Sequence, residues 1–175
     1  MVRIRMMAAG DIEAVSGIRV RGWQAAYAGI VPQGFLDAMD VAEDAAARRE
    51  FFAKSAGRVH NLVAVGATAD GGEEVVGWAS LGPYRGEEAG PEVGELYALY
   101  ARTDRIGTGV GRALTAAACA RAAELGHGRL LLWVLADNAR GRRFYARAGF
   151  APDGAETVHE CDGVPLREVR YARAV

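Results

Sequence analysis

Short stretches in which hydrophobic residues alternate with polar ones, or dominate outright, predict the strands of this chain. At the start, Val2, Ile4 and Met6 alternate with two arginines, a pattern typical of a half-buried strand. Residues 129–136 are mostly apolar at both odd and even positions, as in a strand covered on both faces. The same reasoning predicts further strands at residues 61–65, 75–81, 95–101, 156–161 and 166–172.

Apolar residues that recur three or four positions apart predict the helices. These cover residues 12 to about 29, 35–39, 41–54, 112–125 and 139 to about 148. Asp11, Asp40 and Asn138 stand just before three of them, where a side-chain oxygen accepts hydrogen bonds from first-turn amides. In chain order the elements are β-α-α-α-β-β-β-α-β-α-β-β, which predicts an α/β fold built on a mixed sheet.

Composition and charge limit the class of protein. A chain of 175 residues, 51% of them hydrophobic, fits a single domain over residues 1–175 with a sizeable core. Lysine and arginine number 21 against 22 aspartates and glutamates, so no bulk charge favours a nucleic acid or an anionic membrane as partner. The longest apolar run, residues 130–136, is far too short to span a membrane, and the N-terminus does not resemble a signal peptide. We therefore expect a cytoplasmic protein with neither a nucleic-acid nor a membrane partner.

Cysteine and histidine are sparse and scattered. Cys119 and Cys161 lie far apart, and the three histidines are at positions 60, 127 and 159. No pair among them has the close spacing typical of zinc ligands or of a disulfide framework. We expect no metal.

The candidate chemistry begins with three glycines at alternate positions, Gly107, Gly109 and Gly111, between a predicted strand and a predicted helix. Glycine allows positive φ angles and a close approach of ligand to backbone, and the free amides of a helix N-terminus bind anions such as phosphate. A P-loop would need a Lys-Ser or Lys-Thr pair after the glycines, and a dinucleotide-binding motif would need a third glycine at position 112 or 114. No Lys-Ser or Lys-Thr pair follows these glycines, and Arg112 and Leu114 occupy the two positions for a third glycine, so both motifs are excluded.

This segment resembles motif A of the GNAT superfamily of acyl-CoA-dependent N-acyltransferases, [QR]-x-x-G-x-[GA]. Gly109 and Gly111 match its last two positions, whereas Ile106 stands where the family usually has glutamine or arginine. Because that position binds pyrophosphate largely through its backbone in the family, the departure leaves the resemblance in place. Arg105 and Arg112 flank the loop and supply positive charge.

A second segment, residues 130–150, resembles another signature of the same family, N-x-x-[AS]-x-x-[FL]-Y-x-x-x-G-F after a strand. The matching residues are Asn138, Phe144, Tyr145, Gly149 and Phe150, and Gly141 replaces the usual alanine or serine. The two segments cover about a third of the chain and occur in the family order.

The resemblance implies a central mixed sheet whose fourth and fifth strands splay apart, with acetyl-CoA as co-substrate. The pantetheine arm would lie along Leu99, Tyr100 and Ala101. The pyrophosphate would bind to Ile106, Gly107, Thr108, Gly109, Val110, Gly111 and Arg112, and Asn138 and Tyr145 would also contact the co-substrate. Tyr145 would act as general acid, since a phenol stays protonated at neutral pH and can donate to a leaving thiolate. The alternative is a CoA-binding sensor or interaction module that has lost catalysis.

The acceptor side is less constrained. Glu95, at the head of an apolar strand, is the candidate general base, with Glu92 as second choice. Trp23, Tyr27, Tyr84 and Arg85 are the candidate acceptor-binding residues, although both Trp23 and Tyr27 are equally consistent with core packing.

An arginine at position 85 could hold a carboxylate, which favours a small primary amine bearing a carboxylate or an apolar group as acceptor. An amino acid or a peptide amine also fits this description. A long basic protein tail fits less well, because only the acidic pair Glu87–Glu88 would attract it. Whether the protein forms a homodimer is left open.

Overall fold

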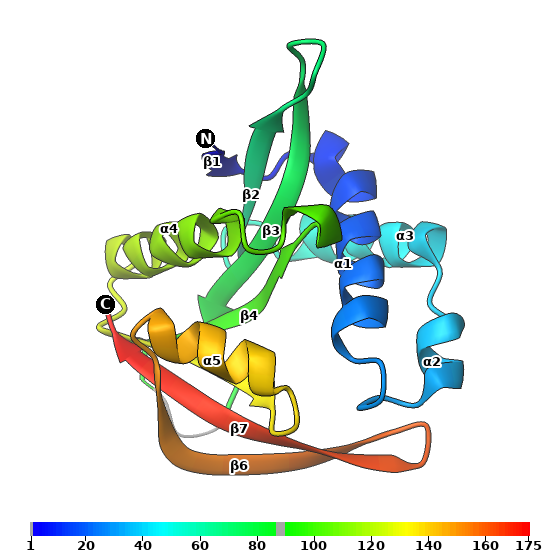
Figure 1. Ribbon diagram of the computed structural model, residues 1–175. Helices are drawn as coiled ribbons and strands as arrows, with labels where there is room; N and C mark the ends of the chain where they lie inside the picture. Colours follow the sequence, from blue (N-terminus) through cyan, green and yellow to red (C-terminus); the bar gives the residue numbers. More distant parts are fainter. Residues whose placement is uncertain (1, 87–89) are drawn as a thin grey trace.

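The sheet is the centre of the architecture, which we describe from a computed structural model for residues 2–86 and 90–175. Seven strands form one sheet in the order β1-β2-β3-β4-β5-β7-β6 (Figure 1). They are β1 Arg3–Met6, β2 His60–Ala67, β3 Glu73–Pro83, β4 Val93–Ala101, β5 Arg129–Leu135, β6 Ala151–Cys161 and β7 Val164–Ala174. β4 and β5 run parallel, and all other neighbours are antiparallel, so the predicted mixed sheet is confirmed. The predicted acidic pair Glu87–Glu88 lies outside the described residues.

Helices cover both faces of the sheet. They are α1 Ile12–Ala26, α2 Gln33–Asp37, α3 Val41–Lys54, α4 Val110–Glu124 and α5 Ala139–Arg147. α1 and α3 pack on one face through a cluster that includes Val15 and Ala45, whereas α4 and the end of α5 pack on the other. The tip of the β6–β7 hairpin reaches toward α2 (Figure 1), and Leu166 of β7 packs in one cluster with Leu36 of α2. None of the helices in the described part of the chain is long and apolar enough to cross a membrane.

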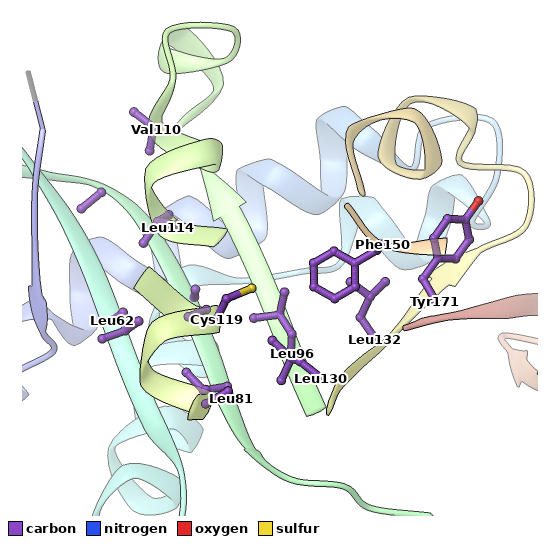
Figure 2. Close-up of a cluster of buried hydrophobic side chains, with 14 of the residues drawn as sticks. Leu62, Leu81, Leu96, Val110, Leu114, Cys119, Leu130, Leu132, Phe150 and Tyr171 are labelled. Carbon is purple, nitrogen blue, oxygen red and sulfur yellow. The ribbon is translucent and has the colours of Figure 1, made fainter. Parts of the chain in front are cut away.

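The main core lies between the sheet and α4. Leu114 of α4, Leu62 of β2, Leu81 of β3 and Leu130 of β5 belong to one cluster of buried side chains (Figure 2). Full burial of such a side chain contributes about 1.5–3 kcal/mol. α4 approaches the sheet closely at Gly77, where a Cβ atom would lie only 2.7 Å from the side chain of Val110. The Val110 side chain, with 1% exposure, therefore belongs to the core at the start of α4, so only its backbone amide is available for the predicted phosphate contact.

The sheet opens between its two central strands. β4 pairs with β5 at three positions, from Val93–Arg129 to Glu95–Leu131, but β4 continues to Ala101 and β5 to Leu135. The register of β4 against β3 also shifts between Ser80 and Leu81, which leaves Tyr97 as an extra residue in β4. Such a bulge bends a strand and increases its twist, so it accounts for the divergence of β4 from β5.

The order of elements matches the prediction throughout. Helix α3 begins after Asp40, whose carboxylate accepts the predicted capping hydrogen bond from the Glu43 amide at 2.9 Å. Asp11 occupies the N-cap position of α1 but does not cap it. Its carboxylate instead accepts hydrogen bonds from the Ala8 amide and from the Arg5 guanidinium.

Candidate active site

A cavity of about 790 Å³ occupies the opening between β4 and β5. Its walls include Leu99, Tyr100 and Ala101 of β4, the residues for which the resemblance implies contact with the pantetheine arm. The predicted loop residues Ile106, Gly107, Thr108, Gly109, Gly111 and Arg112 also line it, as do Asn138 and Tyr145. Segments that are far apart in the chain therefore meet at one site.

One end of the cavity is suited to an anion. Gly107 and Gly109 have φ angles of +84° and +95°, and Gly109 is the N-cap of α4, so the free amides of this helix open toward the loop. A Cβ on Gly111 would lie 3.2 Å from the ring of Phe144, which shows how closely α4 and α5 approach here. Arg105 lines this cavity, and its guanidinium pairs with Glu74 at 3.2 Å and lies 3.8 Å from Asp104.

Three cavity arginines were missed by sequence reasoning. Arg140, Arg143 and Arg147 of α5 line the cavity and are exposed. Their spacing of three and four residues places them on one face of the helix, opposite the loop that carries Arg105 and Arg112. This spacing was visible in the sequence, but it becomes meaningful only once α5 is known to lie beside α4.

Tyr145 is held in place by aromatic contacts. Its ring meets Phe144 at 5.2 Å and Phe150 at 6.0 Å between centroids, both in edge-to-face arrangement. Burial raises the pKa of the Tyr145 phenol above its usual value, and the neighbouring Tyr100 raises it further. The phenol therefore keeps its proton throughout the neutral range.

Asn138 begins the helix that carries Tyr145. Its side-chain oxygen accepts a hydrogen bond from the Gly141 amide at 2.9 Å, so the predicted cap is confirmed. A Cβ on Gly141 would lie 2.6 Å from the Asn138 amide nitrogen. The glycine that departs from the family signature therefore accommodates this rotamer of Asn138.

Trp23 of α1 and Tyr27, the C-cap of this helix, are in contact, but only Tyr27 reaches the cavity. Tyr27 lines the cavity, and its hydroxyl lies 3.3 Å from that of Tyr100. Trp23 is not among the cavity-lining residues. It packs edge-on against Tyr27 at 4.9 Å, and both side chains pack against the cluster that contains Leu36 and Leu166. Trp23 thus fits the core interpretation, whereas Tyr27 belongs both to this cluster and to the cavity wall.

Glu95 and Arg85 form an ion pair away from the cavity wall. The Glu95 side chain is 2% exposed, and its carboxylate accepts hydrogen bonds from the Arg85 guanidinium and, at 3.1 Å, from the Arg85 amide. The guanidinium also lies over the ring of Tyr97 at 4.3 Å. Neither Glu95 nor Arg85 lines the cavity. The geometry thus supports a structural pairing rather than the predicted roles of base and carboxylate ligand.

Tyr84 also lies off the cavity wall. Its hydroxyl accepts a hydrogen bond from Arg170 at 2.8 Å, and the guanidinium of Arg170 lies over its ring. Arg170 is in turn bonded to Asp153 at 2.8 Å. These contacts tie the segment after β3 to β7, so Tyr84 braces two strands in this structure.

The cavity does contain one carboxylate that sequence reasoning missed, Glu168 of β7. It pairs across the sheet with Leu135, at the end of β5. Burial raises the pKa of Glu168, partly offset by His159 and Arg85. No sequence signal identified it, because its position depends on β7 pairing with β5 rather than with β6 alone.

Comparison with known proteins agrees with this geometry. The chain matches the model of the acetyltransferase (GNAT) family over residues 25–150. It is 32% identical to the uncharacterized N-acetyltransferase YuaI of Bacillus subtilis (strain 168), over 97% of this chain and 91% of that protein. The chain therefore belongs to the GNAT family of acetyltransferases. It is an acyltransferase of the acetyl-CoA-dependent N-acetyltransferase class.

Two further likenesses extend the comparison. A mycothiol acetyltransferase of a Nocardioides species is 36% identical over 85% of this chain and 50% of its own length. The solved structure of the PaiA N-acetyltransferase from Thermoplasma acidophilum in complex with coenzyme A superposes with a TM-score of 0.71. That likeness covers 100% of this chain and 99% of the other, at 20% identity, and so concerns the fold.

Proposed function

We propose that this protein transfers an acetyl group from acetyl-CoA to a primary amine of a small molecule, an amino acid or a peptide, with Tyr145 as general acid. The observation that carries the proposal is one continuous cavity. It joins a glycine-rich helix N-terminus, surrounded by arginines, to the ring of Tyr145 through the opening between β4 and β5.

The residues at the anion end fit the phosphates of acetyl-CoA. Arg105 and Arg112 line the cavity beside the loop, where their positive charge suits phosphate oxygens. Gly107 and Gly109 leave open space where a side chain would stand, since a Cβ on either would meet no atom within 4 Å. Acetyl-CoA, when bound, supplies the acetyl thioester. A protein of the same fold, the PaiA N-acetyltransferase, was solved in complex with coenzyme A.

The middle of the cavity suits an extended chain of amide groups. Leu99, Tyr100 and Ala101 line it on the β4 side, beyond the last position at which β4 pairs with β5. Backbone groups of a diverging strand remain available to hydrogen-bond a ligand, as they would to a neighbouring strand. We therefore place the pantetheine arm along these three residues.

Tyr145 supplies the proton for the departing sulfur. Its raised pKa keeps the proton on Oη at neutral pH, but it also makes the phenol a weaker acid than in water. We therefore expect donation to the sulfur to accompany cleavage of the carbon–sulfur bond rather than to precede it. A primary ammonium loses two protons overall on becoming an amide, and one of these restores Oη.

Two measurements test the proposal. A panel of primary amines assayed for release of free CoA in the presence of acetyl-CoA should include at least one substrate. In the Tyr145→Phe variant we expect kcat for that substrate to fall about 10²–10⁴-fold, the usual contribution of a general acid. Acetyl-CoA affinity, measured by calorimetry, should stay within a few-fold because the ring packing is kept.

Two results would change the conclusion. An unchanged kcat in Tyr145→Phe would remove Tyr145 from proton transfer. Tight acetyl-CoA binding without turnover of any amine would instead favour a CoA-binding sensor module of the same fold.

A further inference from the structure

The end of the cavity away from the phosphate site is marked by a single negative charge. Among the described residues that line the cavity, Glu168 is the only aspartate or glutamate. It lies on β7 beside the end of β5, and its charge acts on the phenols of Tyr27 and Tyr100, which line the same wall. A carboxylate in this position faces the ligand space rather than bulk solvent alone.

Charged groups on several neighbouring elements act on the carboxylate of Glu168. His159 of the neighbouring strand β6 approaches it at 3.5 Å, and Arg85 also favours its ionised form, whereas burial and Glu95 oppose ionisation. Arg85 is bound to Glu95, and the arginines that line the cavity belong to the α4 loop and to α5. None of those cavity arginines is among the charges that act on Glu168. His159 is therefore the ion-pair partner of Glu168 among the described residues, and the arginines that line the cavity leave its carboxylate available to a cationic ligand.

The walls near this end are aromatic. Tyr27, Tyr97 and Trp133 line the cavity together with the aliphatic side chain of Leu135, which is the cross-strand partner of Glu168. Aromatic faces accommodate apolar bodies and attract cations, so they reinforce the effect of the carboxylate. The combination fits an amine whose remaining part is apolar or aromatic.

We propose that Glu168 binds the acceptor as an ammonium ion and takes one proton from it, and that the acceptor class is monoamines with an apolar or aromatic body and no carboxylate beside the amine. This inference rests on the proposed acetyl transfer. One N–H bond of the ammonium breaks, the proton moves to a carboxylate oxygen of Glu168, and the electron pair stays on nitrogen as the nucleophilic lone pair. Glu168 then releases this proton to solvent. The assignment replaces Glu95 as base and narrows the acceptor predicted from Arg85.

The first experiment compares two amines that differ by one carboxylate, 2-phenylethylamine and phenylalanine. In the wild-type enzyme we expect kcat/KM to favour 2-phenylethylamine by about 10–100-fold, since the extra carboxylate would meet Glu168 at close range. In Glu168→Gln, kcat/KM for 2-phenylethylamine should fall about 10²-fold, and the preference over phenylalanine should shrink. Glu160→Gln, an exposed glutamate of the same hairpin that lies outside the cavity, is the matched control and should leave both values unchanged.

The pH profile separates a catalytic from a structural role. Because Glu168 must be ionised to accept a proton, wild-type kcat/KM should fall as the pH drops through the raised pKa of Glu168 and level off above it. The glutamine variant should lose this acidic limb, and its kcat/KM should rise steadily with the fraction of neutral amine. If Glu168 had only a structural role, the glutamine variant would show kcat/KM lowered by the same factor at every pH and would keep the acidic limb. That result would overturn the proposal.

Equilibrium binding distinguishes this inference from the proposed function. Calorimetry of 2-phenylethylamine with the protein saturated with CoA, which carries no acetyl group, should show binding that weakens at least tenfold in Glu168→Gln. Glu168-dependent binding without turnover would sustain the acceptor site and refute acetyl transfer. Turnover with equal kinetics in wild type and Glu168→Gln, or equal use of phenylalanine, would refute the role of Glu168 and leave acetyl transfer standing. If the wild-type enzyme neither binds nor acetylates 2-phenylethylamine, the proposed acceptor class is refuted.

Discussion

A charge placed at the loop before α4 should test the phosphate site directly. Gly109 is the N-cap of α4 with φ +95°, and a Cβ there would meet no atom within 4 Å. A side chain at this position is therefore strained by the backbone conformation but not by contacts. Asparagine and aspartate tolerate positive φ better than most residues and have nearly the same shape. Gly109→Asn and Gly109→Asp consequently differ in charge alone.

The expected magnitude follows from this pairing. Both variants should lose about 1–2 kcal/mol of folding free energy, the cost of a left-handed backbone for a residue with a Cβ atom. The aspartate would also repel a bound phosphate: two unit charges 4 Å apart interact with about 1 kcal/mol in bulk water and about 4 kcal/mol near a protein surface. A middle value of about 2 kcal/mol corresponds to a Kd for acetyl-CoA roughly 30-fold weaker in Gly109→Asp than in Gly109→Asn.

The assay is calorimetric titration of acetyl-CoA at low and high salt. The ratio of the two Kd values should shrink toward one in about 1 M salt, where the Debye length is about 3 Å. Gly154 of β6 has φ +90° and equally open surroundings, so the same pair of substitutions there is the control and should give equal Kd values. Equal Kd values for the two Gly109 variants at low salt, with both proteins folded, would show that no phosphate binds at this loop.

Other consequences follow from the packing. Trp23→Ala should lower the free energy of unfolding by about 3 kcal/mol, measured in urea, and leave the amine KM nearly unchanged, since Trp23 packs in a core cluster; the opposite outcome would return Trp23 to the acceptor site. Glu95→Gln should cost about 2 kcal/mol of stability through weaker bonding to its arginine partner, with acetyl-CoA affinity kept; full stability with lost turnover would restore it as a base. Asp40→Ala should cost about 1 kcal/mol by removing the cap of α3, and an unchanged unfolding curve would contradict that role. Arg5 lowers the pKa of Asp11, so this pair contributes its full stabilisation of the fold above the unfolded-state pKa of about 3.9 and loses it as the pH falls through the lower folded-state pKa. The melting temperatures of wild type and Asp11→Asn should therefore converge in that acid range. A difference that stays constant with pH would exclude this linkage.

Local sequence signals were sufficient where a neighbour along the chain decides the structure. The cap at Asp40 and the helix it begins depend on residues within one turn, and the prediction of residues 41–54 matches α3. β6 was predicted to begin at Glu156, but it begins at Ala151. Its early residues include Pro152 and Gly154, which favour turns, and the register indeed shifts between Pro152 and Glu156. Pairing with β7 overrides these local preferences.

The candidate site likewise contains residues that short motifs predict and residues that only the three-dimensional fold brings together. The loop around Gly109 and the helix of Tyr145 were predicted because their chemistry is encoded in short motifs. Glu168 was not, because β7 is inserted between β5 and β6, and only that non-sequential order brings it to the cavity. Arg85 was predicted to bind the acceptor, but its pairing with Glu95 depends on side-chain packing that spacing along the chain does not specify.

The opening between β4 and β5 has a consequence for the mechanics of the whole chain. The sheet consists of a four-stranded part, β1–β4, and a three-stranded part, β5-β7-β6, which the backbone joins at only three residue pairs. A ligand seated in the opening would supply hydrogen-bonding groups where a continuous sheet would have had a further run of strand pairing. We therefore expect bound co-substrate to hold the two parts of the sheet in a fixed relative position. Its departure would speed the exchange with solvent of those amides near Ala101 of β4 and Leu135 of β5 that face the opening.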